Sequence, residues 1–227
     1  MTVLRRQAVP FRLKDPISSL THFAGFLFTI PATSILLIQA GSHACSTASM
    51  TAMAVFMCSM SILYAASAAY HAFHINPLAD GILKRIDHCS IFLLIAGSYT
   101  PVCVCALGDR GSILLKVIWG IALAGICFKI FWVHCPKIVS SIIYIGMGWA
   151  CLSVLPQLIH TLGSGFWYLL AGGLFYTVGG VLYSLKLNLF PHAEETGFGN
   201  HELFHLFVMA GSFCHYLMAL HTLTMIG

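Results

Sequence analysis

The chain has 227 residues, of which 59% are hydrophobic and only 8% are charged. Several apolar runs are about 20 residues long, enough to cross a hydrocarbon core of roughly 30 Å, so we expect one integral membrane domain over residues 1–227. The formal net charge is +4, but the eleven Lys and Arg residues are too scattered for a nucleic-acid interface. Membrane lipids are therefore the expected partners, and no feature of the sequence indicates an oligomeric state.

The apolar runs and their breaks predict an all-α fold, a bundle of seven transmembrane helices. The runs are continuously apolar rather than alternating, which argues against a barrel. The breaks carry residues typical of turns, such as Asn76-Pro77 after the second run and Gly163-Ser164-Gly165 after the fifth. The spans are expected near residues 20–40, 48–70, 87–107, 113–132, 139–160, 166–186 and 203–226.

The distribution of positive charge predicts how the bundle is oriented. Cytoplasmic loops carry an excess of Lys and Arg. Nine such residues lie in the N-terminal segment or near the loops after even-numbered spans, whereas only Arg110 and Lys116 lie on the other side. Because seven spans place the termini on opposite sides, we expect the N-terminus inside and the C-terminus outside. The nine residues are Arg5, Arg6, Arg12, Lys14, Lys84, Arg85, Lys129, Lys137 and Lys186.

Four ionisable residues fall where predicted spans begin or end on this inner side. His71 ends the second span, Asp87 opens the third, and His201 and His205 open the seventh. Ionisable groups at membrane depth are costly and usually mark a functional site. His201 and His205 are four residues apart, so they share one helix face and can reach the same ion. With His71 they offer three imidazole nitrogens, which predicts a divalent metal site, zinc first.

The same region predicts hydrolytic chemistry. Three protein ligands leave a fourth coordination position for water, as in catalytic zinc sites. Asp87 could hold that water or act as a general base. Ser67 lies one turn before His71 on the same face, so its hydroxyl could hydrogen-bond the water or a developing oxyanion. Asp87 and Ser67 are therefore the candidate catalytic residues of a hydrolase.

The other histidines have simpler explanations. A single membrane histidine is more often a hydrogen bonder in helix packing than a ligand. His215 lies ten residues beyond His205, about 15 Å deeper, so it could line a substrate cavity but cannot join the same ion. His22, which opens the first span, and His88, beside Asp87, are intermediate cases. We expect either a hydrogen bond in helix packing or a position in a solvent-exposed loop for His43, His74, His134, His160, His192 and His221.

Three motifs in this order resemble those of the hemolysin III family, which belongs with the progestin and adipoQ receptors and the alkaline ceramidases. They are Ser67-Ala68-Ala69-Tyr70-His71, then Asp87, then His201-Glu202-Leu203-Phe204-His205. The resemblance implies a seven-helix membrane fold with zinc near the cytoplasmic side. It implies metal binding by His71, His201 and His205, a water-mediated role for Asp87, and Ser67 in support. It also implies cleavage of a lipid amide or ester bond, and a bacterial plasma-membrane protein with a role in membrane-lipid homeostasis.

Other functions compete with a lipid hydrolase. The segment His201 to His205 matches His-Glu-x-x-His, in which the Glu would be the base of an intramembrane zinc protease. A pore-forming cytolysin is another candidate; the last span offers polar residues, but the fourth and sixth spans are almost wholly apolar. A non-enzymatic reading is a receptor-like or homeostasis protein, in which zinc locks the second, third and seventh helices and Asp87 serves as a fourth ligand.

Overall fold

A computed structural model describes residues 13–185 and 189–226, and in these ranges all regular secondary structure is helical. Seven segments are long and apolar enough to cross a membrane. Four of the nine positive residues on which the predicted orientation rests lie outside the described ranges, namely Arg5, Arg6, Arg12 and Lys186. The helices are α1 (Pro16–Ser42), α2 (Thr47–Ala72), α3 (Pro77–Ala106), α4 (Gly108–Phe131), α5 (Lys137–Gly148), α6 (Leu155–Leu162), α7 (Gly165–Ser184), α8 (Ala193–Thr196) and α9 (Asn200–Ile226).

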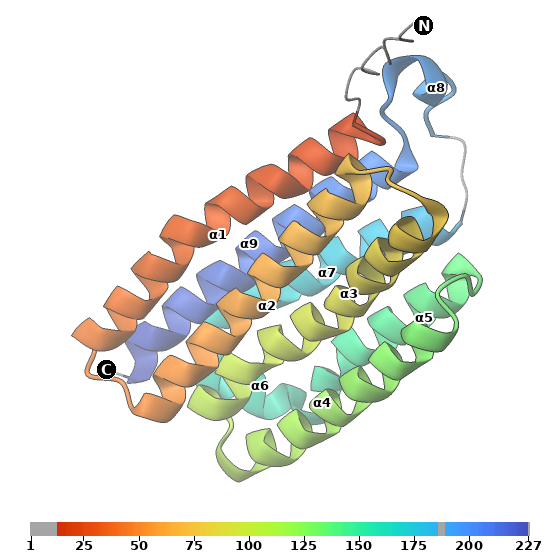
Figure 1. Ribbon diagram of the computed structural model, residues 1–227. Helices are drawn as coiled ribbons and strands as arrows, with labels where there is room; N and C mark the ends of the chain where they lie inside the picture. The colour runs from red at the N-terminus through yellow and green to blue at the C-terminus, as the bar shows by residue number, and fades with distance from the viewer. Residues whose placement is uncertain (1–12, 186–188, 227) are drawn as a thin grey trace, which may run out of the picture.

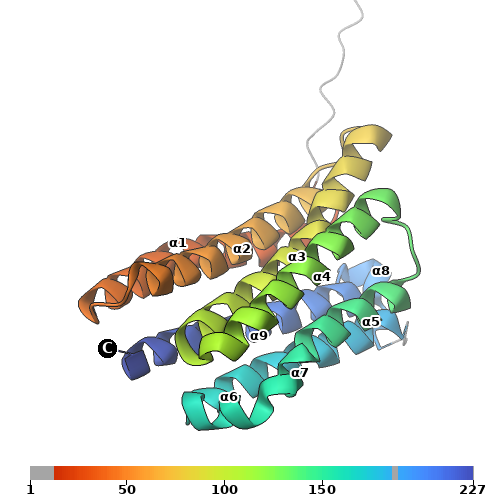
Figure 2. The same cartoon turned by 90° about the horizontal axis from the view of Figure 1, so that it is seen from below.

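The long helices form an elongated bundle in which α1 begins and α9 ends at opposite ends (Figures 1 and 2). Neighbouring helices contact one another in the order α1, α2, α3 and α4 on one side. On the other side α3 contacts α5, α5 contacts α7, and α7 contacts α9, which returns to α1. Because α3 also contacts α9, these two helices approach each other across the bundle, and segments far apart in sequence meet there.

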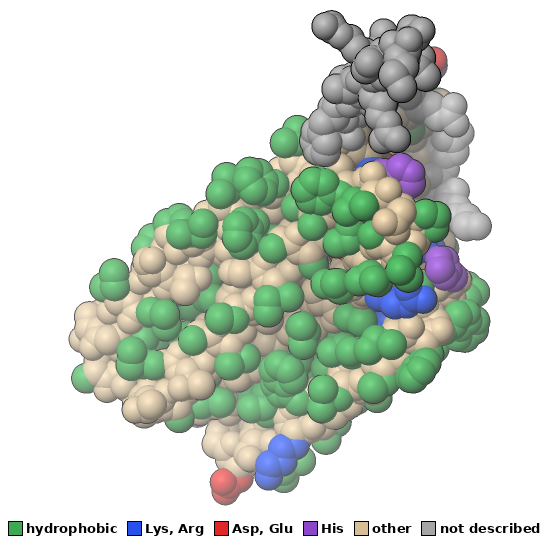
Figure 3. Space-filling model, viewed as in Figure 1, with side chains coloured by type: hydrophobic (Ala, Val, Ile, Leu, Met, Phe, Trp, Pro, Cys, Tyr) green, Lys and Arg blue, Asp and Glu red, His purple; other side chains and the backbone are tan. Residues whose placement is uncertain are grey.

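The surface facing the viewer in Figure 3 carries hydrophobic side chains along the length of the bundle, while charged groups gather towards its two ends. Large apolar side chains remain exposed along the spans, including Ile38 on α1 and Ile113 on α4. A soluble protein rarely shows so much contiguous apolar surface, whereas a lipid-facing one must. The chain is therefore an integral, multi-pass membrane protein.

Helix α3 begins ten residues earlier than the predicted third span. Asn76 caps it, since its side-chain oxygen accepts a hydrogen bond from the Ala79 N–H at 2.9 Å, and Pro77 occupies the first turn. The polar first turns hid this start, because a search for apolar runs passes over Asp80 and the lysine and arginine that follow. Asp87 consequently lies in the third turn of α3 rather than at its opening.

The predicted fifth span is interrupted rather than continuous. Between α5 and α6 the chain forms a 3₁₀ segment, Trp149–Val154, and Pro156 occupies the first turn of α6. The Tyr99 hydroxyl on α3 donates to the Gly148 carbonyl at 2.6 Å and accepts from the Cys151 N–H at 3.0 Å. These bonds satisfy backbone groups freed by the break, as a membrane interior requires.

Small residues let α3 pack closely against α4. A Cβ atom on Gly125 would lie 2.2 Å from the Phe92 ring, so only glycine fits where these two helices meet. Phe92 is fully buried at this contact, together with Ile118 and Met218 in one of two hydrophobic clusters. The close approach fixes α3, the helix that presents Asp87 to the interior.

Candidate metal centre

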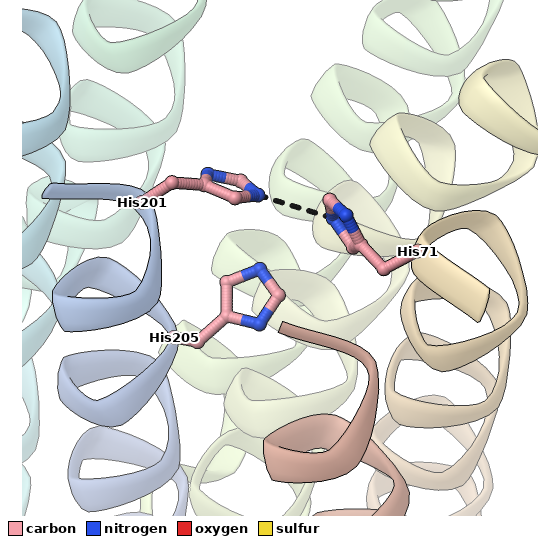
Figure 4. Close-up of side chains that lie close together, drawn as sticks. All are labelled: His71, His201 and His205. Atoms are coloured by element: carbon pink, nitrogen blue, oxygen red, sulfur yellow. Dashed lines mark hydrogen bonds between the residues drawn. The ribbon is translucent and has the colours of Figure 1, made fainter. Parts of the chain in front are cut away.

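Three imidazoles from two helices converge at one end of the bundle. His71 lies in the last turn of α2, and His201 and His205 lie in the first two turns of α9 (Figure 4). One ligand nitrogen from each residue lies within 4.8 Å of the other two. In the described part of the chain this donor group contains these three histidines alone. The cluster could therefore hold a metal ion and leave a coordination position open.

The outer nitrogens of two of these rings are held by oxygen acceptors. His71 Nδ1 lies 2.8 Å from Asp15 Oδ2, and His205 Nδ1 lies 3.2 Å from the Ser18 carbonyl oxygen. Carboxylate and carbonyl oxygens only accept hydrogen bonds, so each Nδ1 carries the proton and each Nε2 keeps its lone pair. Metal-bound histidines are oriented in the same way by carboxylates and carbonyls. The two rings are thus prepared as Nε2 ligands.

The spacing of the inner nitrogens also fits a metal. His71 Nε2 and His201 Nε2 are 3.1 Å apart, the contact drawn as a dashed line in Figure 4. Two nitrogens bonded tetrahedrally to one zinc at its usual bond length lie about 3.3 Å apart. His71 is 4% exposed and His205 2% exposed, so a metal ion held by these rings would be largely shielded from solvent. A bound cation would take the place of the hydrogen bond between His71 Nε2 and His201 Nε2.

Asp87 and Ser67 lie beside the histidine cluster. The Asp87 carboxylate hydrogen-bonds the Ser67 side chain and is close enough to His71 for an electrostatic interaction with its ring. Both residues line the same cavity as His201 and His205, and Ser67 is buried. The structure therefore gathers all five residues singled out from the sequence into one region, even though Asp87 is farther along its helix than expected.

His22 is part of this region, whereas His88 is more peripheral. The His22 ring stacks on His205, with centroids 3.7 Å apart and planes inclined by 14°, and its edge meets Tyr64. Within residues 13–185 and 189–226, neither nitrogen of His22 has a hydrogen-bond partner. Its stacking supports the orientation of His205. His88 lines the cavity, and neither it nor the six histidines assigned to loops or packing joins the donor group.

Glu202 is turned away from the cavity. Its Oε1 accepts from the Ser18 hydroxyl at 2.5 Å, and its Oε2 accepts from the Gly199 N–H at 2.9 Å. The second bond is half of a capping box, in which an acidic residue in the first turn satisfies the N–H just before the helix. One oxygen therefore caps the start of α9, and the other ties α9 to α1. This placement counts against a zinc protease, which needs that carboxylate at the metal.

Asp15 and Ser18 are the contacts that the sequence analysis missed. Asp15 directly precedes α1, and its backbone N–H donates to the His71 carbonyl at 2.8 Å, which ties the start of α1 to the end of α2. The available signal was topological, since a first span that starts inside brings Asp15 to the face where the second span ends. Nothing in the sequence indicated that the Ser18 carbonyl would hold His205.

The cavity beside the cluster is long and mostly apolar. It extends from His201 and His205 at the first turns of α9 to His215 at mid-helix. Apolar side chains from several helices supply much of its wall, including Leu63, Ile91, Leu94, Ile145 and Val208, and polar side chains such as Ser98 and Thr177 lie among them. A cavity that is mostly apolar and has a cluster of ionisable groups at one end suits a ligand with a polar head group and a hydrocarbon chain, such as a lipid.

Comparison with known proteins agrees with this architecture. The sequence profile of the family described as Haemolysin-III related matches residues 12–216. Hemolysin-3 of Bacillus cereus is 37% identical over 214 residues, covering 93% of each chain, and the Hemolysin-3 homolog of Bacillus subtilis is 37% identical over 89% of this chain and 91% of its own. The adiponectin receptor protein of Drosophila melanogaster is 25% identical over 66% of this chain and 37% of its own, which supports the wider superfamily. The chain belongs to the haemolysin III family.

Proposed function

We propose that this protein is a zinc-dependent hydrolase that cleaves an amide or ester bond of a membrane lipid. The observation that carries the proposal is the convergence of three imidazoles at one end of an apolar cavity that Asp87 and Ser67 also line. Three nitrogen ligands with an open position suit a catalytic zinc ion. The apolar walls supply a place for hydrocarbon chains next to the reacting bond.

The residues of the chain divide the chemistry between them. Zinc, when bound, would polarise the lipid carbonyl and make an attacking water available near neutral pH. Asp87 accepts the proton of that water as the new carbon–oxygen bond forms, and then delivers it to the leaving nitrogen or oxygen as the old bond breaks. Ser67, through its interaction with Asp87, keeps the carboxylate directed at the reacting atoms.

We place the metal centre at the cytoplasmic side of a bacterial plasma membrane. Lys14, Lys84 and Lys137 lie at the bundle end that carries the histidine cluster, whereas Arg110 and Lys116 lie towards the opposite end. By the positive-inside rule, the end with the cluster faces the cytoplasm. A substrate would then enter from the inner leaflet.

Metal analysis of detergent-purified protein tests the metal half of the proposal. We expect about one zinc per wild-type chain and loss of that zinc in His71→Ala. The matched control is His74→Ala, because His74 is only three residues away but pairs with Asp80 outside the cluster. Zinc that survives in His71→Ala, or that is lost equally in His74→Ala, would overturn the assignment.

Hydrolysis of lipid amides and esters by the zinc-loaded protein tests the catalytic half. Asp87→Asn should keep its zinc and lose about 10²- to 10⁴-fold in rate, the usual contribution of a general base. Wild-type protein that binds zinc but cleaves neither a ceramide nor an acyl ester, in assays where an added ceramidase does, would point instead to a structural metal.

A further inference from the structure

His215 is a buried histidine whose ring nitrogens have no partner in the described structure. It lies at mid-helix in α9, about 15 Å deeper than His205, and is 7% exposed. Among the described residues, neither Nδ1 nor Nε2 makes a hydrogen bond of good geometry, and the Leu169 backbone is close enough for a weak one at most. An unsatisfied polar ring at this depth is costly and calls for an explanation.

Helix packing does not explain why the ring nitrogens of His215 are left unsatisfied. The neighbouring helix makes room for the ring, since a Cβ atom on Gly172 would lie 2.1 Å from His215 Cδ2. The polar groups around it bond elsewhere: the Tyr176 hydroxyl, whose ring meets His215 edge-on, pairs with Ser212 Oγ at 2.8 Å. The bundle thus accommodates the imidazole while leaving at least one of its two nitrogens without a hydrogen-bond partner among the described residues.

His215 stands where two cavities meet. It lines the cavity that contains the histidine cluster and also a second cavity that continues the apolar interior, and Tyr99 and Trp149 line both as well. Beyond this junction the second cavity is lined by leucines such as Leu114 and Leu158. A chain that starts at the metal centre would therefore pass His215 before its end entered the second cavity.

We propose that His215 binds a hydroxyl group carried partway along the acyl chain of the lipid ligand, so that the protein prefers oxygenated acyl chains. This inference rests on the proposed lipid-cleaving function. A neutral imidazole offers one donor and one acceptor, which matches a hydroxyl, while a plain hydrocarbon would leave both nitrogens unsatisfied. The separation of about 15 Å corresponds to roughly twelve carbon–carbon bonds of about 1.5 Å in an extended zigzag.

Competitive binding to the purified, zinc-loaded protein tests this preference with three fatty acids of equal length. The probes are 12-hydroxyoctadecanoic acid, 3-hydroxyoctadecanoic acid and octadecanoic acid, each displacing a fluorescent fatty acid. We expect the 12-hydroxy acid to bind about tenfold more tightly than the other two, the value of one net hydrogen bond. His215→Leu should abolish the difference, and His215→Gln, which keeps a donor and an acceptor, should retain part of it.

The control variant is His160→Leu, which removes an exposed histidine that lines neither cavity and should keep the preference. Equal binding of the three acids by wild-type protein would overturn the inference, as would a preference that survives in His215→Leu. The wild-type comparison decides the matter even if His215→Leu fails to fold. Because the measurement needs no hydrolysis, a tenfold preference in a protein that cleaves no lipid would refute the proposed function and leave this site standing.

Discussion

The contact between Asp15 and His71 predicts that zinc affinity depends on a residue that cannot touch the metal. Asp15 Oδ2 accepts from His71 Nδ1 at 2.8 Å, and backbone bonds on both sides hold it there: its N–H donates to the His71 carbonyl, and its carbonyl accepts from the Ser19 N–H. Removing such a carboxylate partner typically weakens metal binding 10- to 100-fold. The Asp15 side chain is 41% exposed, so solvent screens part of its charge.

These features set the expected size of the effect. Asp15→Asn keeps an oxygen acceptor for Nδ1 but removes the charge, so we expect roughly a tenfold weaker zinc affinity, or about 1.4 kcal/mol. Asp15→Ala removes the acceptor as well and should approach a hundredfold loss. The assay is competition for zinc between the purified protein and a chromophoric chelator of known affinity.

The chain offers a matched control for this experiment. Asp80 pairs with His74 Nδ1 in the same way and at the same end of the bundle, but that histidine is exposed and lies outside the cluster. Asp80→Asn should leave zinc affinity unchanged. If Asp15→Asn and Asp15→Ala bind zinc as tightly as wild type, or if Asp80→Asn weakens binding equally, then Asp15 does not orient His71 as a ligand.

Three further predictions concern Glu202, the buried Lys129 and the membrane orientation of the two termini. Glu202→Gln should keep lipid hydrolysis within tenfold of wild type and cost about 1 kcal/mol of stability at the start of α9, whereas a loss beyond hundredfold with zinc retained would restore the protease hypothesis. Lys129 is fully buried, and its Nζ donates to Ser140 Oγ at 2.6 Å. In thermal unfolding we expect Lys129→Ala to lower the free energy of unfolding by about 2–4 kcal/mol, because it leaves a cavity, and Lys129→Met, which fills the same space, to lower it by about 1 kcal/mol or less. Equal losses in the two variants would contradict a role for the Lys129 side chain in packing. Tags on the two termini should label from opposite sides of the membrane, and labelling from one side would exclude seven spans.

The sequence was sufficient to predict the histidine cluster because the cluster follows from span counting. His71 at the end of an even span and His201 at the start of an odd span must face the same side, and an i, i+4 pair must share a helix face. Neither step depends on side-chain detail. The same reasoning explains why the seven helices were predictable: about 20 apolar residues in a row have few alternatives to a membrane helix.

The parts that sequence could not predict depend on polar residues whose partners are distant. The start of α3 at Pro77 depends on a cap by Asn76 in a stretch too polar to look like a span. The break after α5 depends on Tyr99, 49 residues away from Gly148, satisfying the freed backbone. The contact of Glu202 with Ser18 joins residues 184 positions apart, so the sequence showed only the His-Glu-x-x-His match and not that Glu202 links α9 to α1. A hydropathy scale ranks residues by their free energy of transfer out of water, and it carries no information about which buried polar groups form hydrogen bonds with one another.

The distribution of polar groups along the interior bears on the choice between an enclosed site and a pore. Polar and ionisable side chains line the cavity from the histidine cluster as far as His215 and Tyr99. Past that junction, in the described part of the chain, the second cavity is walled almost entirely by apolar side chains and cysteines, such as Leu107, Leu155 and Cys103. Ions or water crossing this half would lose their hydration without compensation. The interior is therefore polar where the proposed reaction would take place and apolar where a hydrocarbon tail would end, which favours a site that holds a lipid over a channel that conducts.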